Sequence, residues 1–190
     1  MPINWNSQMS KKSTTRFLTS TLLLTSFFLS FSASANSNVW EGTPFLSFSL
    51  ADQTGKIRTN QEFSGKWLVV YFYPKDKTPG CTIEAQNFTD DYAKYQALGV
   101  EIVGVSYDDI AAHKDFAETY ELPFTLLADT EAQLSKAMKV DRLLPWPHAS
   151  RQTFLVNPQG IIVQHFKKVK PKEHSAELLK SIRRHQENKS

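Results

Sequence analysis

The sequence Pro74-Lys-Asp-Lys-Thr-Pro-Gly-Cys-Thr-Ile-Glu84 contains Cys81, the only cysteine of the 190 residues. It follows the apolar run WLVVYFY at residues 67–73, which predicts a buried strand, and leads into residues 82–98, which predict a helix. Cys81 is therefore expected in the first turn of a helix, where free backbone N–H groups and the helix dipole favour a thiolate. This pattern indicates a reactive thiol. The alternative is a small buried hydrophobic residue whose sulfur does no chemistry.

The first 35 residues have the pattern of a secretory signal. Lys11, Lys12 and Arg16 precede an apolar stretch with many serines and threonines, and Ala33-Ser34-Ala35 forms a small-residue cleavage site. The alternative is an uncleaved membrane anchor, but the stretch is shorter than the roughly 20 apolar residues that span a bilayer. We predict a signal peptide at residues 1–35, one domain at residues 36–190 and no stable membrane anchor.

The charge balance and the cysteine count exclude several classes of function. The leader holds 3 of the 22 basic residues and none of the 19 acidic ones, so residues 36–190 have no formal net charge and no sign of nucleic-acid binding. One cysteine cannot form an internal disulfide, so the thiol is free, pairs between molecules or acts chemically. The chain lacks phosphate-binding glycine loops and metal-ligand spacing, and we predict neither a cofactor nor a metal.

The rest of the sequence predicts an α/β domain with a central mixed sheet flanked by helices. Strands and helices alternate along it, and a hairpin around Asn157-Pro-Gln-Gly160 precedes the closing helix. The expected elements are a strand–turn–strand at 45–59, a strand at 100–106, a helix from 108 or 109 to about 120, a strand at 124–128, a short helix from 129 or 130 through 138, a loop at 140–150, a hairpin at 152–166 and a helix from 172 to about 185. Four histidines without ligand spacing are expected at the surface, namely His113, His165, His174 and His185.

Four separated residues resemble the signature of a known family. Pro74, Thr78 and Cys81 form Pro-x-x-x-Thr-x-x-Cys, and Arg151 begins the late strand Arg-Gln-Thr-Phe-Leu-Val. This combination resembles the peroxiredoxins, which are thiol peroxidases with a thioredoxin-like fold. The Thr-Pro-Gly-Cys-Thr-x-Glu version is similar to the bacterioferritin-comigratory (PrxQ) subfamily, and the resemblance runs from about Thr43 to the last helix.

The resemblance implies a role for each residue of the signature. Cys81 would attack the distal oxygen of a peroxide and become a sulfenic acid. Thr78 would orient the peroxide, Arg151 would stabilise the thiolate and the polarised O–O bond, and Pro74 would shield the pocket from water. Glu84 would hold the guanidinium of Arg151. Each residue taken singly also has a purely structural interpretation, as a turn residue, a strand terminator or a surface charge.

The sequence departs from the subfamily at the second cysteine. Many members have a resolving cysteine five residues after the first, where this chain has Gln86. The resemblance then implies a one-cysteine mechanism, in which hydrogen peroxide or an organic hydroperoxide oxidises Cys81 and an external thiol reduces it. That thiol would be thioredoxin-like, glutaredoxin-like or of low molecular weight. The protein is expected to be a monomer or weak homodimer in the bacterial periplasm.

Two other functions have to be compared with the sequence. A thioredoxin-like electron carrier needs a Cys-x-x-Cys pair, which the chain lacks. A binding or holdase-like module on the same fold, without significant turnover, stays open because fold does not fix function. Trp146 and His148, in the loop before Arg151, would line the pocket mouth or a docking surface for the reductant, or else cover the core.

Overall fold

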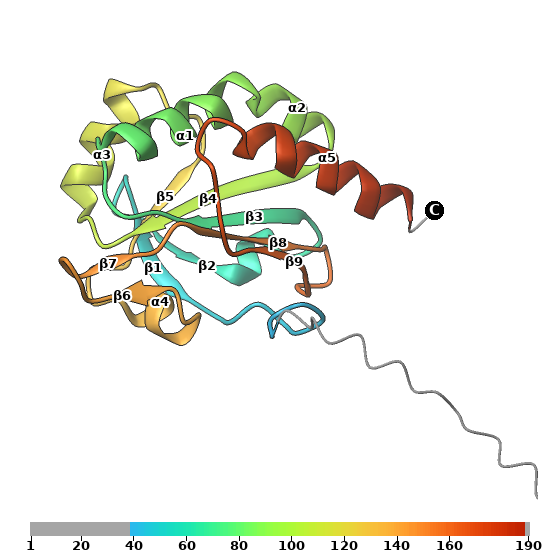
Figure 1. Cartoon of the computed structure of the whole chain (residues 1–190), viewed down its shortest axis with the longest axis horizontal. Helices are drawn as coiled ribbons and strands as arrows, with labels where there is room; N and C mark the ends of the chain where they lie inside the picture. Colours follow the sequence, from blue (N-terminus) through green and yellow to red (C-terminus); the bar gives the residue numbers. More distant parts are fainter. Residues whose placement is uncertain (1–38, 189–190) are drawn as a thin grey trace, which may run out of the picture. The chain divides into compact units, whose positions relative to one another are not determined.

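The computed structural model describes residues 39–188, and the predicted signal peptide lies outside them. Its centre is a seven-stranded mixed sheet with the strand order β2-β1-β5-β4-β3-β8-β9 (Figure 1). The middle strands β3, β4 and β5 are parallel, and the remaining pairs are antiparallel. The strands are β1 Ser49–Asp52, β2 Ile57–Thr59, β3 Trp67–Phe72, β4 Val100–Ser106, β5 Thr125–Ala128, β8 Gln152–Val156 and β9 Ile162–Phe166. A mixed sheet flanked by helices was predicted and is confirmed.

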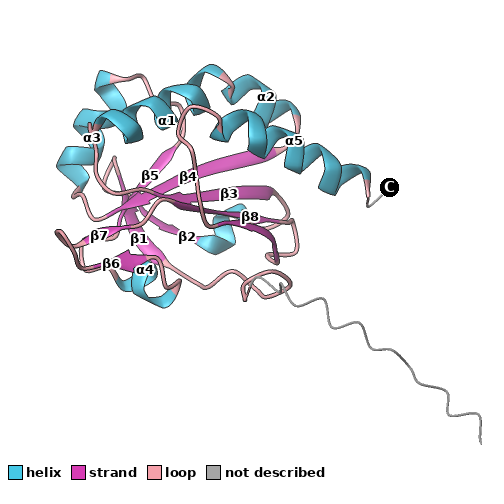
Figure 2. Cartoon of the chain, viewed as in Figure 1, coloured by secondary structure: helices cyan, strands magenta, loops and turns pink. Residues whose placement is uncertain are grey.

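Four helices cover one face of the sheet, and shorter elements cover the other (Figure 2). The first set is α1 Pro79–Asp90, α2 Tyr92–Ala97, α3 Ile110–Thr119 and α5 His174–Glu187. The second set is the 3-10 helix η1 Asn60–Phe63, α4 Gln133–Ala137 and the small pair β6 Asp141–Arg142 and β7 His148–Ala149. Because helices cover both faces, the central strands consist mostly of apolar residues.

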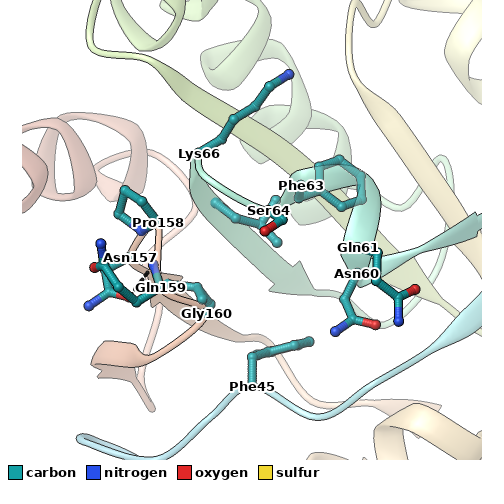
Figure 3. A pocket seen from close by; sticks show the side chains of 12 residues that line it. Phe45, Asn60, Gln61, Phe63, Ser64, Lys66, Asn157, Pro158, Gln159 and Gly160 are labelled. Carbon is teal, nitrogen blue, oxygen red and sulfur yellow. Dashed lines mark hydrogen bonds between the residues drawn. The ribbon is translucent and has the colours of Figure 1, made fainter.

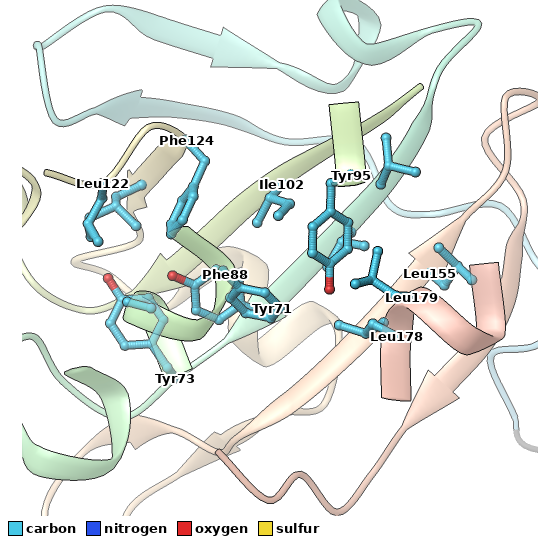
Figure 4. Close-up of a cluster of buried hydrophobic side chains, with 14 of the residues drawn as sticks. Tyr71, Tyr73, Phe88, Tyr95, Ile102, Leu122, Phe124, Leu155, Leu178 and Leu179 are labelled. Atoms are coloured by element: carbon cyan, nitrogen blue, oxygen red, sulfur yellow. The ribbon is translucent and has the colours of Figure 1, made fainter. Parts of the chain in front are cut away.

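Strand β3 divides its side chains between two hydrophobic clusters. Its side chains point alternately to the two faces of the sheet, and all six residues are buried because both faces are covered. Trp67, Val69 and Tyr71 pack under the four helices, whereas Leu68, Val70 and Phe72 pack on the other face. Figure 4 shows part of the first cluster, in which Tyr71 and Phe88 of α1 lie with ring centroids 4.9 Å apart. This packing fixes α1, and with it Cys81, over the end of β3.

The predicted single helix at 82–98 is two helices. The first helix begins at Pro79, and the chain breaks at Asp91, which has φ −95° and ψ 1°. The Asp91 carboxylate accepts a hydrogen bond of 2.6 Å from the hydroxyl of Ser175 in α5. A contact with a residue 84 positions away therefore accompanies the break, and periodicity alone does not predict it.

Three further predictions were wrong in detail. The loop expected at 140–150 contains the paired strands β6 and β7, and the short helix α4 begins only at Gln133. His113, His165 and His174 are buried instead of exposed. Their side chains have polar partners inside the fold, and these partners come from distant parts of the sequence.

Candidate active site

Cys81 is the third residue of α1 and lies at the end of the central strand. Thr78 is the N-cap residue, and Pro79 occupies the first helical position, where its missing N–H costs no hydrogen bond. The loop from β3 contains Lys77 at φ 57°, a conformation that is uncommon for a residue with a side chain. Cys81 is 1% exposed. The thiol is thus held just below the surface, at the positive end of a 12-residue helix.

Arg151 reaches Cys81 because β3 and β8 are antiparallel neighbours. Phe72 at the end of β3 pairs with Gln152 at the start of β8, which places Arg151 beside the loop that follows β3. Its Nη2 donates to the Cys81 sulfur over 3.1 Å, across 70 residues of sequence. Its Nη1 donates to Oε2 of Glu84, one turn after Cys81. One guanidinium therefore contacts both the sulfur and the carboxylate.

Burial and charge act in opposite directions on the pair of Glu84 and Arg151. Burial raises the pKa of Glu84 from 4.5 to about 7, although the charge and hydrogen bond of Arg151 oppose that rise. Burial alone would lower the pKa of Arg151, but the charges of Glu84 and Cys81 more than offset it, so the pKa of the guanidinium is raised. The second oxygen of Glu84, Oε1, is buried without a hydrogen-bond partner among the described residues. The positive charge is therefore permanent, whereas the negative one depends on pH near neutrality.

Thr78 and Pro74 lie on the same loop and are half-buried. The Thr78 hydroxyl donates to the backbone carbonyl of Lys75 over 2.9 Å, so its own oxygen is left as an acceptor. Gly80 packs close to the arginine, since a Cβ there would lie 3.2 Å from Arg151 Nη2. The first turn of α1 and Arg151 are thus in close contact.

A buried polar network behind the loop was missed by the sequence analysis. The Tyr73 hydroxyl donates to Oδ1 of Asp76 over 2.7 Å, and His113 Nδ1 lies 2.8 Å from Oδ2. His113 comes from α3 and is fully buried. Its position was predictable, because His113 shares helical spacing with Phe116 and Ala117, which are also buried. The network joins α3 to the loop that carries Thr78.

Trp146 and His148 differ in burial. Trp146 is 51% exposed, so it does not cover the core, whereas His148 is buried. The His148 Nδ1–H donates to the Trp146 carbonyl over 2.6 Å, and the two rings lie 5.1 Å apart. Leu143 and Leu144, in the same segment, are 69% and 83% exposed.

A separate pocket lies at the opposite end of β3 (Figure 3). Its volume is about 270 Å³, and its lining includes Phe45, Phe63 and the turn from Asn157 to Gly160. Lys66, its only titratable lining residue, pairs with Glu101 over 2.8 Å. Within residues 39–188, no three or more His, Cys, Asp or Glu side chains gather as a metal site would require. No helix in the same range is long and apolar enough to cross a bilayer.

Comparison with known proteins gives one consistent family. The AhpC/TSA family matches residues 42–165. Peroxiredoxin Q, chloroplastic, from Triticum aestivum is 43% identical over 136 residues, covering 71% of this chain and 63% of the relative. Peroxiredoxin Bcp from Bacillus subtilis is 40% identical over 127 residues, covering 64% of this chain and 81% of the relative. The chain thus matches less than two thirds of the wheat protein.

A solved structure extends the likeness to three dimensions. The bacterioferritin comigratory protein of Xanthomonas campestris, described for its alkyl peroxide reduction activity, superimposes with a TM-score of 0.69 and is 33% identical. The match covers 73% of this chain and 91% of that protein. The predicted thioredoxin-like peroxiredoxin fold is confirmed by such neighbours.

Proposed function

Since the chain belongs to the AhpC/TSA family, among whose members it is similar to peroxiredoxins Q and Bcp, we propose that it is a thiol peroxidase that uses Cys81. The observation that carries the proposal is the 3.1 Å contact between Arg151 Nη2 and the Cys81 sulfur at the start of α1. A fixed positive charge at a sulfur stabilises the thiolate, which is the nucleophilic form of cysteine. The X. campestris relative supports organic hydroperoxides as substrates beside hydrogen peroxide.

The first step is an attack of the Cys81 thiolate on the distal oxygen of the peroxide. The S–O bond forms as the O–O bond breaks, the sulfur is oxidised to a sulfenic acid, and the leaving oxygen takes up a proton as water or an alcohol. Negative charge moves from the sulfur to the leaving oxygen during this step. Arg151 already lies beside the sulfur and can stabilise that charge without rearranging, as preorganised donors do.

The other residues of the signature would position the reactants. Because the Thr78 proton is engaged by Lys75, the Thr78 oxygen is available to accept a hydrogen bond from the peroxide O–H. Pro74 would limit the access of water. Glu84 would orient the guanidinium by holding Nη1 while Nη2 contacts the sulfur.

The second step requires a thiol from outside the chain. No second cysteine exists in the 190 residues, and Gln86 occupies the position of the subfamily's resolving cysteine on the exposed side of α1. An external thiol would attack the sulfenic sulfur, form a mixed disulfide and release water, and a second thiol would restore Cys81. We further propose that the protein is a monomer or weak homodimer. The predicted signal at residues 1–35 favours secretion across the inner membrane, and the subfamily resemblance favours the bacterial periplasm as the destination.

The proposal is tested by the intact mass of the protein after one equivalent of hydrogen peroxide, quenched within seconds, with and without a sulfenic-acid trap. We expect a trap adduct on Cys81 that is at least about 100-fold slower to form in Arg151→Ala and is also slowed in Thr78→Val. The variant Arg183→Ala, which changes an exposed arginine of α5, serves as a control and should react like the parent. If Cys81 reacts no faster than an ordinary thiol, the peroxidase is refuted and the non-catalytic binding or holdase-like module becomes the better interpretation.

A further inference from the structure

A lysine-rich segment lies against the first turn of the helix that carries Cys81. Residues 167–172, with the sequence KKVKPK, connect β9 to α5 and are called the lysine segment below. In Figure 1 this connection rises across the sheet to reach α1 before α5 begins. The side-chain amide of Asn87 in α1 donates to the carbonyl of Pro171 over 3.1 Å. Pro171 also lies 3.7 Å from the place of a Cβ on Gly80, which is itself beside Arg151.

The lysine segment presents positive charge that the structure leaves largely unpaired. Its four lysines are exposed. Lys170 pairs with Glu173 over 3.2 Å, whereas Lys167, Lys168 and Lys172 form no ion pair within residues 39–188. Residues 36–190 as a whole have no formal net charge, so this concentration of lysines is local. Arg151 also lies next to it, but its charge is paired with Glu84 inside the site.

We propose that the lysine segment recruits the reductant of Cys81 and that this reductant is a small thiol carrying carboxylate groups. The inference rests on the proposed one-cysteine peroxidase and names the class of its second substrate. Charges of one sign around a reactive centre raise the local concentration of oppositely charged molecules and their association rate. Exposed lysines would attract a thiol that carries carboxylates. The same lysines would not raise the local concentration of a neutral peroxide.

The burial of the thiol favours a small molecule over a protein. Cys81 is 1% exposed, and the side chain of Arg151, 17% exposed, lies over its sulfur. A thiol on a protein surface would have to bring its own backbone against the lysine segment and α1 to reach this depth. A free thiol of a few heavy atoms carries no such backbone around its sulfur.

The chemistry consumes two molecules of the small thiol. The thiolate of the first attacks the Cys81 sulfenic sulfur, an S–S bond forms, the S–O bond breaks, and hydroxide leaves and is protonated to water. The second thiolate attacks the outer sulfur of this mixed disulfide. That step releases the Cys81 thiolate and a small disulfide. The two small thiols together lose two electrons, and the sulfenic acid of Cys81 gains them.

The test compares the rates at which three small thiols of different charge reduce the Cys81 sulfenic acid. The sulfenic acid is formed beforehand with one equivalent of peroxide. The probes are mercaptosuccinate, 2-mercaptoethanol and cysteamine, and the decay of the sulfenic acid is followed by quenched intact mass at low and high salt, with each rate corrected for thiolate content. We expect the mercaptosuccinate rate to fall about three- to tenfold at high salt, whereas the mercaptoethanol rate stays constant. The double variant Lys168→Gln/Lys172→Gln should lose a similar factor for mercaptosuccinate alone at low salt. The matched control Lys136→Gln/Lys139→Gln, near α4 on the other face of the sheet, should behave like the parent.

The outcomes separate this inference from the proposed function. Equal charge dependence in both double variants, or none in the parent, would overturn the role of the lysine segment while leaving the peroxidase intact. Faster reduction by an acidic protein thiol than by mercaptosuccinate at equal concentration would overturn the choice of a small reductant. Sulfenic acid formation is measured before any thiol is added, so its failure would remove the peroxidase itself, and the inference with it.

Discussion

Replacing Glu84 by glutamine tests the balance between two effects on the pKa of Glu84, namely burial, which raises it, and Arg151, which lowers it. Burial raises the pKa of Glu84 from 4.5 in an exposed carboxyl group to about 7 in the folded protein, and Arg151 limits that rise. The folded state therefore binds the proton of Glu84 more tightly than the unfolded state. Glutamine is nearly the same size and cannot ionise, so it should abolish the pH dependence that this proton causes.

The expected magnitude follows from the two pKa values. A pKa raised on folding contributes stability that is fully present below pH 4.5 and is lost as the pH rises through about 7. The difference of about 2.5 units corresponds to roughly 3–4 kcal/mol, since each pKa unit is worth about 1.4 kcal/mol, and most of it is lost between pH 4.5 and pH 7.5. The free energy of unfolding of the parent should thus fall by about 3 kcal/mol relative to Glu84→Gln between pH 4.5 and pH 7.5.

Urea unfolding of both proteins between pH 4 and pH 8 measures this difference directly. Burial also lowers the pKa of His165 to about 4 and of His174 to about 3, but both histidines titrate in parent and variant and cancel in the difference. A difference that stays constant from pH 4 to pH 8 would refute the argument. It would mean that the interaction with Arg151 cancels the effect of burial, so that folding leaves the pKa of Glu84 at its ordinary value of 4.5.

Three further substitutions probe the surroundings of the site. His113→Leu should lower the free energy of unfolding by about 1–3 kcal/mol in urea titrations, because it leaves the buried carboxylate of Asp76 without one of its partners. Gly104→Ala should cost about 1–3 kcal/mol in the same assay, since the new Cβ would lie 2.8 Å from the ring of Tyr71 in a filled core. His174→Gln should flatten the acid destabilisation of the parent, because burial, helped by the charge of Arg151, keeps the pKa of His174 near 3. The free energy of unfolding of the parent therefore falls as the pH drops below 6.5, by up to about 1.4 kcal/mol per pH unit from this group. Acid unfolding followed by circular dichroism measures this fall in the parent and in the variant.

Each of the three has an outcome that contradicts it. If His113→Leu and the double variant with Asp76→Leu are equally stable, the carboxylate is not left unsatisfied by loss of the histidine. Gly104→Ala with unchanged stability would show that the core relaxes around Tyr71. An unaltered acid slope in His174→Gln would assign the acid lability to other groups.

Features encoded by neighbouring residues were predictable from the sequence. The apolar run of β3 and the turn at Asn157–Gly160 have signals a few residues long, and the strand and hairpin form where they were expected. Cys81 was placed in the first turn of a helix because a strand, a Pro/Gly loop and a helical period follow each other directly. The family resemblance supplied Arg151, which local pattern alone marks only as the start of a strand.

The contacts that define the site depend on sheet order, which no local signal encodes. Arg151 meets Cys81 because β8 pairs with β3 in a register that aligns Gln152 with Phe72. His113 and Asp76 likewise meet only because α3 packs beside the loop after β3. The position of the reactive thiol in the first turn of a helix follows from the sequence alone. The free N–H groups and the dipole of a helix N-terminus arise from consecutive residues. Tertiary structure decided which charges surround that thiol, because charges interact through space, and residues far apart in the chain become neighbours only when the sheet forms.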